Sequence, residues 1–253
     1  PSKVVALGAG IQGHLLAGGR RDFLLLDVIP LALGIETVGG TFSKLITANT
    51  TVPTEAKELY TTHVDNQTAI EINIYQGERE LVHDCRCLGC FKLRGIPAMK
   101  AGLPLVEVTF RVDANGILTV SALEKRSQTD ASIEVIPFHG LTQQEIDDLL
   151  EASYDHAVED FTARQLIEFR QTAERVLQGI EMHWTIAEKA LAQTDCTAIR
   201  QQMEVVRQRM EGQDPQVLKS EMDRLGDLTR SLADTVMGQA VLSALQEKEI
   251  TPV

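Results

Sequence analysis

The sequence predicts an α+β protein with segregated secondary structure, in which antiparallel strands come first and helices follow. Residues 1–138 contain 13 of the 18 glycines and 6 of the 8 prolines, whereas residues 139–253 contain only two prolines, Pro215 and Pro252. The acidic excess is also uneven: the net charge of −12 divides into −2 before residue 139 and −10 after it. A compositional change of this size indicates a domain boundary near Phe138.

The first part of the chain, past residue 30, is predicted to form an antiparallel β-sandwich. The row Ile70, Ile72 and Ile74 alternates with polar residues, which is typical of a strand with one buried face. Asp113–Gly116 has the composition of a tight turn. One apolar face per strand implies two packed sheets or a barrel. Strands are expected at residues 68–75, 105–112, 117–123 and 132–136.

The second part is predicted to form a helical bundle. Thr142 and Glu145 have the spacing of a capping box, in which each side chain satisfies the other's backbone N–H at the start of a helix. Apolar residues then recur at helical spacing, which favours a bundle core over a functional stripe. They are Ile199, Met203, Val206, Met210, Leu225, Leu228, Leu232 and Val236.

Composition also argues against several classes of protein. A net charge of −12 is unsuited to a nucleic-acid groove, because phosphates require a surface rich in lysine and arginine. We find no apolar run long enough to span a membrane and no secretory signal. Four cysteines are too few for a disulfide framework in 253 residues. We therefore expect a soluble cytoplasmic protein without nucleic-acid or membrane partners.

Two local motifs suggest other functions. Gly8, Gly10 and Gly13 form a G-x-G-x-x-G motif, and Asp27 follows at about the distance of a ribose-binding acid, which would suit a nicotinamide-dependent oxidoreductase. That fold requires further βαβ units, and period-2 strands follow instead.

The other motif is the cluster Cys85, Cys87 and Cys90, which could hold a metal if His63 or His83 supplied a fourth ligand. The alternative is a strand or loop with free thiols, and we expect no bound metal. No arrangement of catalytic residues stands out.

Several ordered motifs resemble the 70-kDa heat-shock chaperones, the DnaK-like Hsp70 family. The resemblance implies a fragment in which residues 1–21 are a remnant of the last helix of the nucleotide-binding domain and residues 22–27 are the interdomain linker. Residues 28–138 would form the β-sandwich peptide-binding domain and residues 139–253 the α-helical lid. The motifs are Asp22–Gly40, Asn49–Pro53, Asp65–Ala69, Gln76–Arg79, Val112–Leu118 and Gly140–Thr142.

The resemblance also implies site residues, by position. The pocket for a client side chain would be lined by Leu33, Ile35, Tyr60, Ile70, Ile72 and Val108. Val38 and His63 would form an arch over the client, whose backbone would be contacted by Thr37, Thr61 and Gln67. The linker residues are Phe23, Leu24, Leu25, Leu26 and Asp27, and the candidates for a latch to the lid are Asp65, Lys100, Glu174 and Gln178.

Within the family, three segments resemble the specialised bacterial members that serve iron–sulfur cluster assembly: Asp84–Arg86, Leu93–Ala98 and Glu124–Lys125. Such a chaperone would bind a Leu-Pro-Pro-Val-Lys type segment of the scaffold protein IscU. Its other partners would be a J-type co-chaperone (HscB) and its own nucleotide-binding domain. The alternative is a general DnaK-type folding chaperone. We expect no enzymatic activity and no cofactor in this fragment, with ATP or ADP and Mg in the full-length parent.

Overall fold

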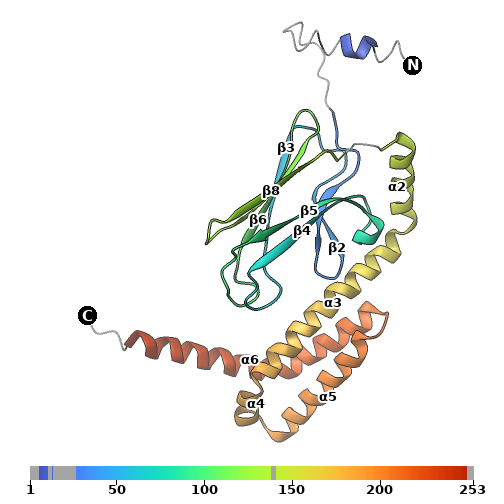
Figure 1. Ribbon diagram of the computed structural model, residues 1–253. Coiled ribbons are helices and arrows are strands. Elements are labelled where there is room, and N and C mark those ends of the chain that lie inside the picture. The colour runs from blue at the N-terminus through green and yellow to red at the C-terminus, as the bar shows by residue number, and fades with distance from the viewer. Residues whose placement is uncertain (1–5, 11–12, 14–26, 138–140, 250–253) are drawn as a thin grey trace. The chain divides into compact units, whose positions relative to one another are not determined.

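The computed structural model describes residues 6–10, 13, 27–137 and 141–249, with side chains described up to Gly238, and the chain divides into two compact units (Figure 1). The first unit runs from Pro1 to His156 and the second from Ala157 to Val253. Helix α2 (Gln143–Asp155) therefore belongs with the strands. The division falls after this helix, later in the chain than the change in composition at Phe138.

The described part of the first unit contains two four-stranded sheets, with strand orders β2-β1-β4-β5 and β3-β6-β7-β8. All neighbouring strands are antiparallel. The predicted α+β class is therefore confirmed. The strands are β1 (Leu33–Thr37), β2 (Thr41–Ile46), β3 (Thr54–Tyr60), β4 (Ala69–Gln76), β5 (Arg86–Arg94), β6 (Val106–Val112), β7 (Leu118–Glu124) and β8 (Asp130–Val135).

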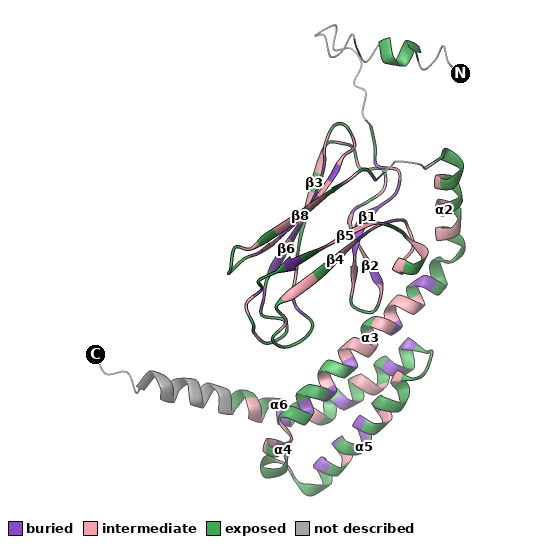
Figure 2. Cartoon of the chain, in the orientation of Figure 1, coloured by how far each residue is buried: buried purple, intermediate pink, exposed green. Residues whose placement is uncertain are grey.

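The two sheets share one apolar core, and its residues alternate along the strands as the sequence predicts (Figure 2). On β6 the inward residues are fully buried, and on β4 Ile72 and Ile74 join the same core. Ile70, in the same row, is only half-buried. The row of isoleucines thus runs from the core toward a more open end of the unit.

The expected turn at Asp113–Gly116 joins β6 to β7. The Asp113 carboxylate accepts hydrogen bonds from the backbone N–H groups of Asn115 and Ile117 at 2.8 and 2.9 Å. Gly116 has φ +77°, a conformation that costs glycine little. These contacts also hold the pKa of Asp113 below its ordinary value, chiefly through the bond from Ile117.

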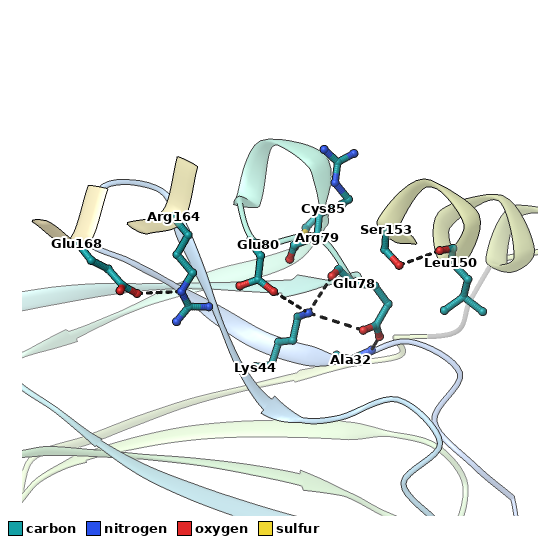
Figure 3. Close-up of polar contacts among 10 residues, drawn as sticks. All are labelled: Ala32, Lys44, Glu78, Arg79, Glu80, Cys85, Leu150, Ser153, Arg164 and Glu168. Carbon is teal, nitrogen blue, oxygen red and sulfur yellow. Dashed lines mark hydrogen bonds and ion pairs between the residues drawn. The ribbon is translucent and has the colours of Figure 1, made fainter. Parts of the chain in front are cut away.

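A loop after β4, containing the 3₁₀ helix η1 (Val82–Asp84), is held against the first sheet (Figure 3). The Lys44 ammonium donates to the backbone carbonyl of Glu78 at 2.8 Å and to the carboxylate of Glu80 at 3.3 Å. The Glu78 carboxylate accepts from the N–H of Ala32 at 2.7 Å. Two further backbone bonds, Phe42 N to Glu80 O and Val82 N to Gly40 O, fix this loop along β2.

Helix α2 begins with the expected capping box. The Thr142 hydroxyl accepts from the N–H of Glu145 at 3.3 Å, and the Glu145 carboxylate accepts from the N–H of Thr142 at 2.7 Å. The capping prediction is therefore confirmed.

The second unit consists of helices packed around their own apolar core. Ile199, Met203 and Val206 are buried as predicted, but Leu228 is 37 % exposed, although Leu225 and Leu232 on the same helix are buried in that core. No described helix combines the length and apolarity needed to cross a bilayer. The helices are α3 (Ala157–Met182), α4 (Trp184–Ala190), α5 (Gln193–Met210) and α6 (Pro215–Glu249).

A single arginine on α3 closes the turn between α5 and α6. The Arg170 guanidinium donates to the carbonyl oxygens of Met210 at 2.7 Å and Gly212 at 2.9 Å. Met210 is the last residue of α5 and Gly212 lies just beyond it, where no intrahelical donor remains for their carbonyl groups. Arg170 therefore acts as a C-terminal cap supplied by a different helix.

Candidate functional site

A cavity of about 680 Å³ opens at one end of the first unit, and both sheets contribute to its walls. Ile35, Ile70 and Ile72 come from β1 and β4, whereas Tyr60 and Val108 come from β3 and β6. Four of these five side chains are aliphatic, and three of them, Ile35, Ile72 and Val108, also belong to the core. The volume and apolar lining suit the burial of an apolar side chain.

The turn between β1 and β2 forms one side of the cavity mouth. Gly39 and Gly40 have φ +85° and +76°, which favour glycine. The hydroxyls of Thr37 and Thr41 lie 2.5 Å apart, and the N–H of Gly40 donates to the carbonyl of Thr37 at 3.1 Å. This closed turn presents Val38, which is 43 % exposed, at the mouth.

The loop between β3 and β4 forms another side of the mouth. Its shape depends on Gln67, whose Oε1 accepts from the N–H groups of His63 at 3.2 Å and Val64 at 3.3 Å. The Gln67 amide nitrogen donates to the carbonyl of Ala69 at 2.9 Å. His63, exposed on this loop, lines the cavity mouth together with Thr61.

Tyr60 forms part of the wall where the two sheets meet. Its hydroxyl donates to the Glu58 carboxylate at 3.0 Å and lies 3.1 Å from the Ser43 hydroxyl. Burial raises the pKa of Tyr60 above its ordinary value of 10, and the nearby Glu58 carboxylate acts in the same direction. The phenol is therefore neutral over the physiological range.

Two carboxylates of residues beside the cavity have polar partners on the outer face of the first sheet. Glu36 accepts a hydrogen bond from the Asn73 amide at 2.9 Å, and Glu71 pairs with Lys92 at 3.4 Å. Both carboxylates belong to residues that line the cavity. Because side chains alternate along a strand, Glu36 and Glu71 point to the face opposite Ile35, Ile70 and Ile72, so their carboxylates do not make the cavity itself acidic.

The structure brings together ten of the eleven residues expected at the pocket, the arch and the client backbone. They are Ile35, Thr37, Val38, Tyr60, Thr61, His63, Gln67, Ile70, Ile72 and Val108. Leu33 is the exception: it is fully buried in the core and does not line the cavity. Leu33 lies on β1 two residues farther from the mouth than Ile35 does. Its neighbours on the adjacent strands are Gln76 and Ile46.

Sequence reasoning missed several lining residues: Glu36, Gly39, Leu59, Glu71, Asn73, Gly102, Leu105 and Val106. Val106 could have been found, because it begins the alternating segment that includes Val108. Leu59 and Leu105 carry no such signal: they are 57 and 47 % exposed, Leu59 on β3 and Leu105 in the loop just before β6.

The remaining implied residues lie apart from the cavity lining. Phe23, Leu24, Leu25 and Leu26 of the linker fall outside the described residues, whereas Asp27 is described and accepts from the N–H of Val28 at 2.9 Å. The latch candidates Asp65 and Lys100 lie on loops of the first unit, and Glu174 and Gln178 lie on α3 of the second. The latch stays a prediction.

The cysteine cluster divides into two environments. Cys85 packs against Gly77, and burial raises the pKa of its thiol to about 11. A bulge in β5 pairs Cys87 with Tyr75 and Cys90 with Asn73, which places both exposed thiols on the outer face of the sheet. Among the described residues, no three His, Cys, Asp or Glu side chains are arranged to hold a metal ion.

The glycine motif does not occur in the setting that a dinucleotide fold requires. Residues 6–10 and Gly13 are helical, and the described sheets contain antiparallel pairs only. A phosphate-binding turn between a parallel strand and a helix is absent from this described part of the chain.

Sequence comparison identifies the family of the chain. The family "Hsp70 protein" matches residues 1–238, and the chain belongs to this family. The chain is 43 % identical to proteins named "Chaperone protein HscA homolog" from Pseudomonas aeruginosa LESB58 and Methylococcus capsulatus Bath, over 100 and 99 % of its length. It is equally identical to "Chaperone protein HscA" of Klebsiella pneumoniae 342. It spans 41 % of the length of each relative.

This match corrects one expectation from the sequence. We expected the chain not to be an enzyme, and that expectation is wrong: the matched family is one of ATPases, and the match runs from residue 1 to residue 238. The identification as an Hsp70 chaperone similar to HscA is confirmed.

Proposed function

We propose that the first unit of this Hsp70 chain binds an extended client peptide, with one apolar side chain of the client inserted in the cavity. The observation that carries the proposal is the aliphatic cavity of about 680 Å³ at the end of the two sheets. Extended peptides are recognised by main-chain hydrogen bonds combined with pockets for particular side chains. On this proposal residues 28–138 form the peptide-binding domain and residues 139–253 form the helical lid.

The surface around the cavity supports this assignment. Val38, Leu59 and Leu105 line the mouth and are each more than two-fifths exposed. Val64 and Leu103 add exposed apolar surface on the adjoining loops. Apolar side chains grouped at the mouth of a cavity are typical of an interaction site.

The client that we propose is the scaffold protein of iron–sulfur cluster assembly, IscU, through a Leu-Pro-Pro-Val-Lys type segment. Support comes from the HscA names of the relatives and from the aliphatic lining of the cavity, which suits the leucine or valine of that segment. A J-type co-chaperone (HscB) and the nucleotide-binding domain would be further partners. The proposed location is the bacterial cytoplasm, because the relatives named above are bacterial.

ATP or ADP with Mg is proposed for the full-length protein. The cavity itself does not fit a nucleotide, because its floor is aliphatic and its lining contains no lysine or arginine to bind phosphates. The described residues also provide no cluster of three metal-binding side chains. We therefore assign the nucleotide to no residue of this cavity.

The proposal can be tested by fluorescence anisotropy with a fluorescein-labelled peptide containing Leu-Pro-Pro-Val-Lys. Ile70→Phe should fill the cavity and weaken binding at least tenfold, while circular dichroism shows that the unit still folds. Ile133→Phe is the matched control, because Ile133 is also partly buried but does not line the cavity. A peptide whose Leu and Val are replaced by Ser should not bind.

Unchanged affinity in a folded Ile70→Phe protein would show that the peptide binds elsewhere. A general DnaK-type chaperone is the second candidate, since the chain belongs to the Hsp70 family as a whole. It would be favoured if unrelated peptides rich in Leu and Arg bound as tightly as the Leu-Pro-Pro-Val-Lys peptide.

A further inference from the structure

Two loops at the mouth of the cavity are fastened to each other by backbone hydrogen bonds. We call residues 61–68 the first mouth loop and residues 95–105 the second mouth loop. Both contribute lining residues, among them His63 and Gly102. The hydrogen bonds run from Asn66 N to Met99 O at 2.7 Å, from Gly102 N to Thr62 O at 3.0 Å and from Ile96 N to Thr68 O at 3.1 Å.

A side chain adds a fourth connection between the mouth loops. The Oδ1 atom of Asp65 accepts from the N–H of Ala101 at 2.7 Å. A hydrogen bond to an ionised carboxylate is stronger than one between neutral groups. Asp65 is therefore engaged within the first unit, in a contact that requires no partner on the lid.

The Gln67 side chain likewise forms its hydrogen bonds within the first unit, to backbone groups in and next to the first mouth loop. Its carbonyl oxygen accepts from two backbone N–H groups, those of His63 and Val64, and a carbonyl oxygen has two lone pairs. Its amide nitrogen donates to the carbonyl of Ala69. The side chain thus uses its acceptor capacity and one donor to shape the loop, which leaves little for a client backbone.

We propose that Gln67 and Asp65 are positioning residues: they hold the mouth loops in a fixed geometry and thereby set the rate at which a client peptide enters and leaves the cavity. This inference rests on the proposed peptide-binding function and deepens it. It also replaces the expected direct contact between Gln67 and the client backbone. Thr61 and His63 keep their places at the rim only while Gln67 holds the loop closed.

The loop-holding role can be tested without any client, by amide hydrogen exchange followed by NMR on the free chain. Gln67→Met keeps the length of the side chain but removes its amide. Because a hydrogen bond contributes about 1 kcal/mol net, exchange at His63 and Val64 should become about five- to tenfold faster. Gln67→Glu keeps an acceptor for both N–H groups, so their protection should persist.

A matched control is available in another turn. The Gln128 side chain donates to the carbonyl of Lys125 at 2.6 Å, and Gln128 does not line the cavity. Gln128→Met should therefore leave exchange at His63 and Val64 unchanged. Asp65→Ala should speed exchange at Ala101, whereas Asp65→Asn should restore most of the protection because it retains an acceptor oxygen.

The effect on a client is measured by stopped-flow fluorescence with the labelled Leu-Pro-Pro-Val-Lys peptide. Loosened mouth loops should both admit and release the peptide faster, so Gln67→Met should raise the association and dissociation rates severalfold, and Gln67→Glu should resemble the wild type. A direct contact from the Gln67 amide predicts faster dissociation alone, in both variants.

Unchanged amide exchange in Gln67→Met would overturn the inference, as would faster dissociation with unchanged association. These results are distinct from a failure of the proposed function. If the wild-type chain binds none of the peptides, the peptide-binding proposal is wrong, and the exchange experiment still decides whether Gln67 and Asp65 hold the mouth loops.

Discussion

The hydroxyl oxygen of Tyr60 lies 3.1 Å from that of Ser43, and this contact joins strand β3 of one sheet to strand β2 of the other. Both strands are at the edges of their sheets. Since the Tyr60 proton is donated to Glu58, the Ser43 hydroxyl is the donor in this pair. One tyrosine therefore connects the two sheets beside the cavity.

Removing the Tyr60 hydroxyl should weaken this connection. We expect Tyr60→Phe to lower the free energy of unfolding by about 1 kcal/mol, because Ser43 and Glu58 lose a partner. Urea denaturation followed by circular dichroism measures the change. Tyr154→Phe is the control, since Tyr154 is 79 % exposed and should change nothing. Equal stability of the two variants would show that the contact contributes little.

The raised pKa of Tyr60 predicts a loss of stability in alkali. The unfolded tyrosine ionises near its ordinary pKa of 10, before the folded one does. The folded state then binds more protons than the unfolded state, so stability falls as the pH rises above about 10. Tyr60→Phe should reduce this fall, while the raised pKa of Tyr75 leaves part of it in place. An unchanged alkaline profile would contradict the assignment to Tyr60.

Gly34 is predicted to tolerate no side chain. A Cβ atom at this position would lie 1.9 Å from the carbonyl oxygen of Ser43, a backbone atom that cannot move aside without disturbing β2. Gly34→Ala should cost about 1–3 kcal/mol or more of unfolding free energy. Gly179→Ala on α3 meets nothing within 4 Å and should be neutral or stabilising. Thermal denaturation of the two alanine variants provides the comparison.

The four cysteines should react with iodoacetamide at two different rates. Cys87 and Cys90 are exposed, so we expect rapid modification of both at pH 7.5. Cys85 should react slowly because burial raises its thiol pKa to about 11, and Cys196 should react slowly because it is buried. Peptide mass spectrometry at timed intervals identifies the modified residues. Rapid modification of Cys85 would indicate that the loop around it opens readily.

The stabilisation of α2 by its capping box should depend on pH. The bonds from Thr142 hold the pKa of Glu145 below its ordinary value of 4.5. Their stabilising effect is therefore present above about pH 4.5 and is lost as the pH falls through the folded pKa. Thr142→Ala should destabilise α2 by about 1 kcal/mol at neutral pH and reduce the acid dependence only in part, because the backbone N–H of residue 142 still donates to Glu145. Amide exchange along α2 between pH 3 and 7 gives the measurement.

Local patterns in the sequence predict much of the first unit. The alternation around Val108 and Ile72 identifies strands β6 and β4, because each strand buries one face only. The turn at Asp113–Gly116 and the cap at Thr142 are equally local. Such features depend on neighbouring residues, so one sequence is sufficient to find them.

The cavity depends on contacts that no local pattern contains. Its expected residues came from the family resemblance, and Leu33 shows the limit of that transfer: two positions from Ile35 on the same strand, it lies in the core. The bond from Asp65 to Ala101 joins residues 36 positions apart through a backbone N–H that every non-proline residue possesses. The residue types at these positions therefore do not predict the contact.

The cap that Arg170 supplies to α5 has a consequence for the order in which the second unit folds. Two carbonyl groups of the turn after α5 receive their donor from a residue about 40 positions earlier, so the α5–α6 turn gains its last hydrogen bonds only when it meets α3. Contacts between distant positions slow folding because the intervening chain must first be closed into a loop. Because α3 precedes the hairpin in the chain, we expect α5 and α6 to complete their turn as they pack against α3.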